Sequence, residues 1–155
     1  MKYALVLLSF TLGVLLAFPF TSMLGHSEGK WKNLKRDGPW EFKYPNGTVQ
    51  MAGRYDEGLE EGPWKLYYEN GQLQAEGSFT AGKKDGVWIE YYENGKKKSA
   101  GSYHKDLETG KWTFWYPNEQ IRSEGEYYQG KQHGSWSYWD EEGNTVGTLN
   151  YPIRH

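Results

Sequence analysis

The sequence predicts an all-β protein: one elongated, single-layer antiparallel meander of about five tandem β-hairpins. Three observations predict it. A tryptophan recurs every 24 residues, a glycine precedes each of these tryptophans by two residues, and an Asn-Gly pair follows in each of the first three units. The 155-residue chain contains 20 Gly, 13 Tyr and 8 Trp. This composition on a fixed period is typical of a β-rich repeat array.

An uncharged run of 22 residues, from Tyr3 to Leu24, comes first. Its length is that of a membrane-spanning helix, which needs about 20 apolar residues. A cleaved signal peptide is the alternative, but its small-x-small cleavage site is poorly matched, since Leu15 lies two residues before Ala17. We therefore expect residues 1–25 to form a hydrophobic helix, either a signal anchor or a signal peptide.

The charges around this run bear on the side of the membrane that the body occupies. Lys2 precedes the run, whereas Lys30, Lys32, Lys35 and Arg36 follow it. The positive-inside rule alone would place the body in the cytoplasm. The basic cluster begins several residues beyond the run, however, and N-terminal export signals often override such a bias. We expect a membrane-anchored or exported body in the cell envelope.

The repeats define the rest of the chain. Gly29-Lys30-Trp31 falls 24 residues before Gly53-Arg54-Tyr55, so residues 26–36 are predicted to be a linker and a partial capping repeat. Residues 37–155 form the predicted repeat domain. The residues expected to carry its structure are Trp40, Trp64, Trp88, Trp112 and Trp136, with Gly53, Gly77, Gly101 and Gly125.

Asn46-Gly47 sets the expected register, because Asn-Gly between alternating segments is the strongest short hairpin signal and fits a type I′ turn. Segments such as Asp56-Glu57-Gly58 are the expected return turns. Asn118-Glu119 departs from the pattern and predicts a longer or different turn, since a glutamate at positive φ costs about 1 kcal/mol. Counting back from the first turn gives the pairs Tyr44–Val49, Phe42–Met51, Trp40–Gly53 and Gly38–Tyr55, and likewise Trp64–Gly77, Trp88–Gly101 and Trp112–Gly125. Each large ring is then expected to lie over a glycine.

Strand alternation divides the side chains between two faces. The face with the tryptophans is apolar in nearly every unit and is the predicted packed side. The other face is polar, except that an aromatic residue stands three positions after the tryptophan from the second unit on. We name these residues the aromatic column: Tyr67, Tyr91, Trp115 and Trp139. The same register places Lys98 across from Tyr91 and Arg122 across from Trp115, where cation–π contacts are possible.

The aromatic column has two interpretations. In one, the rings only stiffen a single-layer sheet from its second side. In the other, they form a recognition stripe, because exposed Tyr and Trp on a rigid sheet suit protein anchors or stacking on sugar rings. The predicted binding residues are then Tyr67, Tyr91, Trp115, Trp139, Lys98 and Arg122.

Several classes of function find no support in the sequence. The chain has no cysteine, which excludes disulfides and thiolate metal sites. Its net charge of −2 comes without a basic block and argues against nucleic-acid binding. Its four histidines lack ligand-like partners, and no nucleophile–base pair is evident. We therefore predict no catalytic residues, no metal, no cofactor and no enzymatic activity.

The pattern Gly-x-Trp-x-x-Tyr-Tyr-x-Asn-Gly, followed by Gly-x-Tyr, resembles the membrane occupation and recognition nexus (MORN) repeat in its bacterial variant. The pattern is clearest from Glu61 to Gly71 and from Asp85 to Gly95, and the resemblance covers about three quarters of the chain. It implies a curved antiparallel sheet, with roles in protein contact, scaffolding and lipid contact. Some bacterial relatives are labelled YwqK-type antitoxins, which implies a protein partner. Asn118-Glu119, Asp140 and Leu149 depart from the pattern in the last two units.

Together these features predict a non-catalytic scaffold for protein–protein interaction at the membrane or cell envelope. Two alternatives remain. One is an envelope carbohydrate or lipid binder that uses the aromatic column, and the other is an antitoxin-like neutraliser of a partner protein.

Overall fold

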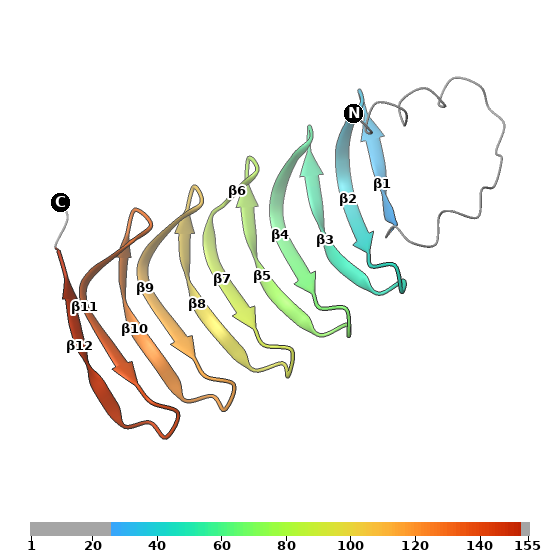
Figure 1. Cartoon of the computed structure of the whole chain (residues 1–155). Coiled ribbons are helices and arrows are strands. Elements are labelled where there is room, and N and C mark those ends of the chain that lie inside the picture. Colours follow the sequence, from blue (N-terminus) through green and yellow to red (C-terminus); the bar gives the residue numbers. More distant parts are fainter. Residues whose placement is uncertain (1–25, 153–155) are drawn as a thin grey trace, which may run out of the picture.

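The computed structural model describes residues 26–152, which form one antiparallel sheet of 12 strands and contain no helix. The strands follow one another across the sheet in chain order, from β1 at one end to β12 at the other (Figure 1). Only β6 lies off this path, as a short partner of β5. The all-β meander is therefore confirmed, while the expected N-terminal helix falls in residues 1–25, outside the described part of the chain.

The strand bounds show how regularly the hairpins repeat. The strands are β1 (Ser27–Lys32), β2 (Lys35–Lys43), β3 (Val49–Asp56), β4 (Leu59–Tyr67), β5 (Leu73–Thr80), β6 (Lys83–Lys84), β7 (Gly86–Tyr91), β8 (Lys97–His104), β9 (Leu107–Trp115), β10 (Ile121–Tyr128), β11 (Lys131–Trp139) and β12 (Thr145–Tyr151). Within residues 26–152, no helix is long and apolar enough to cross a membrane.

The predicted register is correct in the body of each hairpin and wrong at its tip. Trp40 pairs with Gly53 and Phe42 with Met51, as predicted, and the corresponding tryptophans of the next three hairpins pair as expected. Val49, however, lies opposite Lys43 instead of Tyr44. A bulge between this pair and the Phe42–Met51 pair takes up the one-residue shift, so the register in the rest of the hairpin is the predicted one.

The turn explains the difference at the tip. The amide of Tyr44 donates to the carbonyl of Thr48 (2.8 Å), and the amide of Gly47 donates to the carbonyl of Tyr44 (2.9 Å). Three residues therefore form the loop, and Gly47 alone among them has a positive φ, of 87°. This is the three-residue loop with a left-handed glycine, not a type I′ turn. Asn46 stabilises the loop through its side chain, whose oxygen accepts a hydrogen bond from the Thr48 amide (2.8 Å).

Type I′ geometry is found at the return turns instead. Glu57 and Gly58 have consecutive positive φ values of 46° and 92°, and Asp56 pairs with Leu59 on either side of them. The expected exception at Asn118-Glu119 is wrong, because Glu119 adopts a φ of 71° and its amide bonds to Tyr116 as in the other units. The Asn118 side chain holds this turn, since it accepts a hydrogen bond from the Gln120 amide (3.0 Å) and donates one to the carbonyl of Glu141 (2.8 Å).

The tryptophans pack on glycines, but not on their own hairpin partners. A Cβ placed on Gly53 would lie 2.1 Å from the indole of Trp64, which belongs to the next hairpin. Each indole therefore leans over the preceding hairpin, and its N–H donates to a carbonyl there, as Trp64 does to Arg54 (3.2 Å). The same contact recurs for Trp40 on Gly29, Trp88 on Gly77, Trp112 on Gly101 and Trp136 on Gly125. The predicted ring-over-glycine contact is present, but it joins neighbouring repeats instead of the two strands of one hairpin.

Candidate functional site

The two faces of the sheet differ in how much of their aromatic surface the fold itself uses. On the tryptophan face, the five repeated indoles are buried, with Trp64 only 1% exposed. Their edges meet the rings of neighbouring strands, as in the contact between Tyr55 and Trp64, whose centroids are 5.1 Å apart. Edge-to-face contacts of this kind stabilise each repeat against the next. The indole faces are therefore buried in the core and are not available for stacking on a ligand.

The opposite face carries the aromatic column, and its rings are half-buried. Because of the tip bulges, the residues opposite the column are not those predicted. Tyr67 pairs with Leu73, Tyr91 with Lys97, and Trp115 with Ile121. The column is therefore interleaved with a second set of side chains, and together they form a continuous row across seven strands. We call this row the stripe: Tyr67, Leu73, Tyr91, Lys97, Trp115, Ile121 and Trp139.

Lys98 and Arg122 are not part of the stripe, so the predicted contacts of Lys98 with Tyr91 and of Arg122 with Trp115 are wrong. The Lys98 ammonium lies 3.8 Å from Glu90, and the Arg122 guanidinium lies 5.6 Å from the ring centre of Phe114. Both partners are on the tryptophan face. The bulge after each Asn-Gly turn shifts strand parity by one residue, which turns these two cations to the other side of the sheet.

A cleft opens in the stripe between its third and fifth members. Tyr91, Lys97 and Trp115 line it together with the turn residues Lys96 and Glu119, and its volume is about 430 Å³. The Lys97 ammonium lies 6.0 Å from the ring centre of Trp115, and Lys96 forms an ion pair with Glu119 (2.7 Å). Lys97 is the one basic side chain in the stripe.

The Tyr91 ring is held in place by a side chain of the preceding strand pair. Its hydroxyl donates a hydrogen bond to Glu76 (2.9 Å). Burial of the ring is the larger cause, and this hydrogen bond the second, that raises the pKa of Tyr91 above its usual value. Glu76 in turn lies 3.9 Å from the Lys65 ammonium. A ring fixed by its own hydroxyl loses little conformational freedom when a partner covers it.

The column position of the first unit is a lysine instead of a ring. The Lys43 ammonium is 3.3 Å from Glu41 and 3.4 Å from Glu28. The hydrogen bonds that the Lys43 ammonium donates to these two carboxylates, the one to Glu41 first, raise the pKa of Lys43. The aromatic part of the stripe therefore begins at Tyr67.

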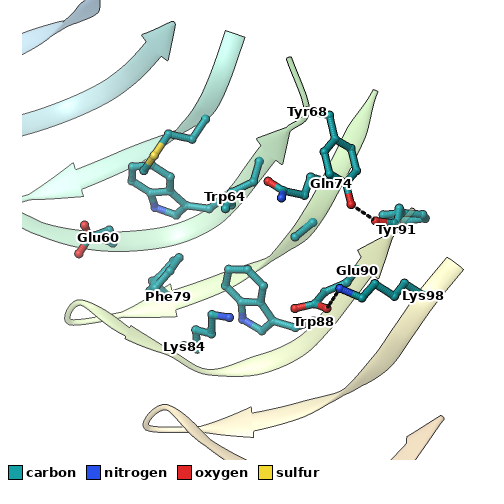
Figure 2. A pocket seen from close by; sticks show the side chains of 13 residues that line it. Glu60, Trp64, Tyr68, Gln74, Phe79, Lys84, Trp88, Glu90, Tyr91 and Lys98 are labelled. Carbon is teal, nitrogen blue, oxygen red and sulfur yellow. Dashed lines mark hydrogen bonds and ion pairs between the residues drawn. The ribbon is translucent and has the colours of Figure 1, made fainter. Parts of the chain in front are cut away.

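The tryptophan face also has a groove, between the second and third hairpins (Figure 2). Its apolar floor includes Leu66 and Phe79, and charged side chains stand at its two ends. At one end the Lys84 ammonium lies 4.3 Å from the ring centre of Trp88, and at the other Glu90 faces Lys98. Both ammonium groups thus already contact groups of the chain itself, Lys84 the Trp88 ring and Lys98 the Glu90 carboxylate.

Glu90 is the residue of this groove that the sequence analysis passed over. The two neighbouring units have Leu66 and Phe114 at the same position, so the carboxylate replaces an apolar side chain on the packed face. Its partners are the hydroxyl of Ser99 (3.1 Å), which is buried, and Lys98. A single polar residue at an otherwise apolar repeat position was a visible signal for it. Leu73, Lys97 and Ile121 gave no such signal, because strict alternation assigned them to the other face.

Metal-binding geometry is absent from the described residues: between His26 and Pro152, no three His, Asp or Glu side chains are grouped so that they would hold a metal ion. His104 is exposed, and its ring nitrogen lies 3.2 Å from the Asp85 carboxylate.

Comparison with known proteins gives a clear result at the level of the repeat. No curated protein matches the chain. One solved structure with some similarity is the crystal structure of a GtfA/B complex bound to UDP and GlcNAc, at 10% identity and a TM-score of 0.33. That match covers 86% of this chain but only 24% of the other, so the chain spans about a quarter of its length.

The family match covers most of the described sheet. The MORN repeat variant matches four consecutive segments, residues 36–57, 60–81, 84–105 and 108–128. Each segment contains one tryptophan strand, its Asn-Gly or Asn-Glu turn and the return strand, so the family unit and the structural hairpin coincide. MORN repeats are generally associated with protein or membrane-lipid interactions and are typically non-catalytic. The chain belongs to the MORN repeat variant family.

Proposed function

We propose that this protein is a non-catalytic scaffold that binds a partner protein through the stripe. The observation that carries the proposal is a row of half-exposed rings, from Tyr67 to Trp139, on the face that the tryptophan core does not use. Ile121 within this row is 37% exposed. The core accounts for the tryptophans on the packed face, and nothing in the sheet covers the stripe.

The surroundings of the stripe support a protein partner. Protein interfaces have an apolar centre rich in Tyr and Trp and a polar rim. The stripe is bordered along the strands by the ion pairs Lys65–Glu76 and Lys111–Glu124. At the turns it is bordered by Lys96–Glu119. These pairs are partly exposed, so they add little to stability and suit the rim of an interface.

The proposed location is the membrane or the cell envelope. Its support is the uncharged run from Tyr3 to Leu24, which is long enough for a membrane anchor. Protease added to intact cells and to spheroplasts tests this location. Digestion of the repeat domain in spheroplasts agrees with an extracytoplasmic body, and protection from protease contradicts it.

Two adjacent lysines allow a sharp test of the stripe. Lys97 and Lys98 are both exposed, yet Lys97 lies in the stripe and Lys98 points to the tryptophan face. Replacing either one with a photo-crosslinking amino acid in the full-length chain changes the chemistry equally. We expect crosslinking in intact cells to attach a partner protein at position 97 and not at position 98. Crosslinks at 98 alone, or none at either position, contradict the proposal.

An envelope glycan is the second candidate, and the cleft between Tyr91 and Trp115 favours it. Its volume of about 430 Å³ is of the size that small-molecule sites have. Replacing Trp115 with Ala tests this candidate through binding of isolated cell-wall polysaccharide to the full-length chain. Loss of polysaccharide binding, with no protein crosslinked at position 97, would replace the first candidate with the second.

An antitoxin-like role is a special case of the first candidate, in which the partner is a toxic protein. The identity of the protein crosslinked at position 97 decides it. Co-expression then checks the result: the full-length chain is expected to restore growth of cells that produce that protein, and the Trp115→Ala variant is expected to restore it less.

A further inference from the structure

The last strand of the sheet differs from every other strand in its chemistry. β12 has the sequence Thr-Val-Gly-Thr-Leu-Asn-Tyr and is the one strand of residues 26–152 without a charged side chain. At the other end of the sheet, β1 carries Glu28, Lys30 and Lys32. Charged residues on an edge strand prevent pairing with other chains. The β1 edge is protected in this way and the β12 edge is not.

β12 also has apolar side chains in water. Val146 is 69% exposed and Leu149 is 56% exposed. No strand of the described chain pairs with the outer edge of β12. Every second residue of that edge therefore turns its N–H and C=O groups outward, as in any unpaired antiparallel edge.

Leu149 determines which kind of strand this edge can accept. It occupies the repeat position at which the preceding units have Gly29, Gly53, Gly77, Gly101 and Gly125. At those glycines a Cβ would lie 2.1–2.4 Å from the nearest indole atom of the following hairpin. A leucine at this position therefore blocks the indole of any further tryptophan strand, and β12 cannot be followed by another repeat of the same kind.

A second β12 fits where a tryptophan strand does not. We propose that β12 pairs with β12 of a second copy of this chain, in antiparallel orientation about a two-fold axis at Thr148. Since Leu149 and Gly147 share the tryptophan face, the axis places Leu149 of each copy opposite Gly147 of the other. Gly147 has no side-chain neighbour within 4 Å of an added Cβ, so a leucine finds room there. Thr148 meets its own counterpart on the opposite face, which is a favourable cross-strand pair.

The surface beside β12 supports this arrangement. A hollow of about 850 Å³ opens on the tryptophan face of the last two hairpins, and Val146, Gly147 and Leu149 form its outer wall. Pairing two copies through β12 places the two hollows side by side around the axis. It also removes the exposed Leu149 side chain from water, which favours association. The partner differs from the one proposed for the stripe, and Trp139 is the one stripe residue that also lines this hollow.

The absence of cysteine from the chain gives a direct test. Thr148→Cys in the full-length protein places the two sulfur atoms across the axis, within the Cα separation that a disulfide requires. Asn150→Cys is the matched control, because its two copies are separated by four strand positions, or about 13 Å. After treatment of cells with a thiol oxidant, we expect at least roughly tenfold more disulfide-linked dimer with Thr148→Cys than with Asn150→Cys.

A charge at the edge tests whether the pairing depends on β12 itself. Adding Leu149→Lys to Thr148→Cys should abolish the covalent dimer, while circular dichroism shows an intact sheet because residue 149 is exposed. Equal crosslinking at 148 and 150, no crosslinking at either, or crosslinking that survives Leu149→Lys would overturn the proposal.

Discussion

The glycines beneath the indoles show how single residues determine the contact between repeats. At Gly77 an added Cβ would lie 2.2 Å from the Trp88 ring. That ring cannot move aside easily, because it is buried and its N–H donates to the carbonyl of Ser78 (3.0 Å). A methyl group added at this position would therefore push two neighbouring hairpins apart.

We predict that Gly77→Ala lowers the free energy of unfolding by about 3 kcal/mol, through overpacking against a rigid ring. Gly62→Ala is the matched control, since Gly62 has a φ of 69° but no neighbour within 4 Å of an added Cβ. Its cost is the left-handed backbone alone, about 1 kcal/mol. Urea unfolding measures both, and equal losses for the two variants would show that the indole contact is not the reason for the glycine.

Tyr103 makes stability dependent on alkaline pH. Burial first, then the charges of Glu108 and Glu90, raise the pKa of Tyr103 to about 12. In the unfolded chain the pKa of a tyrosine is about 10. Between these two values the folded chain keeps a proton that the unfolded chain has lost. The free energy of unfolding contributed by this group is therefore present below pH of about 10 and is lost as the pH rises toward 12.

We accordingly expect urea midpoints to fall between pH of about 10 and 12, and to fall less steeply in Tyr103→Phe, which has no phenol to ionise. Phenolate absorbance of the folded chain should show tyrosines that titrate late, because the pKa values of Tyr55 and Tyr127 are also raised by burial. An unchanged slope in Tyr103→Phe would contradict the assignment.

At the scale of the hairpin, hydrogen bonds from one unit to the next run along both edges of the sheet. At the Asn-Gly edge, tyrosine hydroxyls donate to the backbone of the following hairpin, as from Tyr68 to the carbonyl of Tyr91 (2.7 Å). At the return-turn edge, backbone amides do the same toward the preceding hairpin, as from Gly82 to Glu60 (2.9 Å). These bonds couple neighbouring repeats, and they explain why the repeated tyrosine follows the column residue directly.

Removing one rung tests this coupling. Tyr68→Phe should cost about 1 kcal/mol or slightly more, because a part-buried carbonyl loses its donor. Tyr67→Phe is the matched control one residue away, on the other face, where the hydroxyl makes no hydrogen bond within the described chain. If both variants lose the same stability in urea, the hydroxyl of Tyr68 does not couple the hairpins.

The sequence predicts the strands of this sheet better than its turns. Periodicity and the Asn-Gly signal were sufficient for the strands, their order and the Trp–Gly pairs. They were insufficient for the turn type, because Asn46 is selected for its side-chain hydrogen bond and not for a positive φ. That one extra loop residue requires a bulge, and the bulge reversed the faces of Lys97 and Lys98. Strand alternation identified the aromatic column but not the residues opposite it, Leu73, Lys97 and Ile121, because a bulge has no sequence period.

The departures of the last unit have a physical reason that the sequence alone did not supply. In the earlier units the repeated tyrosine donates to the next hairpin, but no hairpin follows β12 in the described chain. Asp140 stands there instead and accepts a hydrogen bond from the amide of Asn144 (2.7 Å), closing its own turn. The side chain of Asn144, as the first cause, lowers the pKa of Asp140.

On the scale of the whole molecule, the sheet has no closed core, and each hairpin is stabilised mainly by its two neighbours (Figure 1). The stability of such an array should increase with the number of units. Inserting a second copy of residues 84–107 after residue 107 is a direct test, because both junctions keep the 24-residue register. The inserted tryptophan then covers Gly101, and the inserted glycine lies under the indole of Trp112, as in the parent.

We expect this six-unit chain to show a urea m-value larger by about a fifth, because one more unit's surface is exposed on unfolding. Two added strands should lengthen the particle by about 10 Å in small-angle scattering. The matched control inserts the same segment with one additional alanine in the strand, which moves every following side chain to the wrong face. That chain should be less stable than the parent. If both insertions are tolerated equally, the register between repeats does not determine stability, and the nearest-neighbour description of this sheet is wrong.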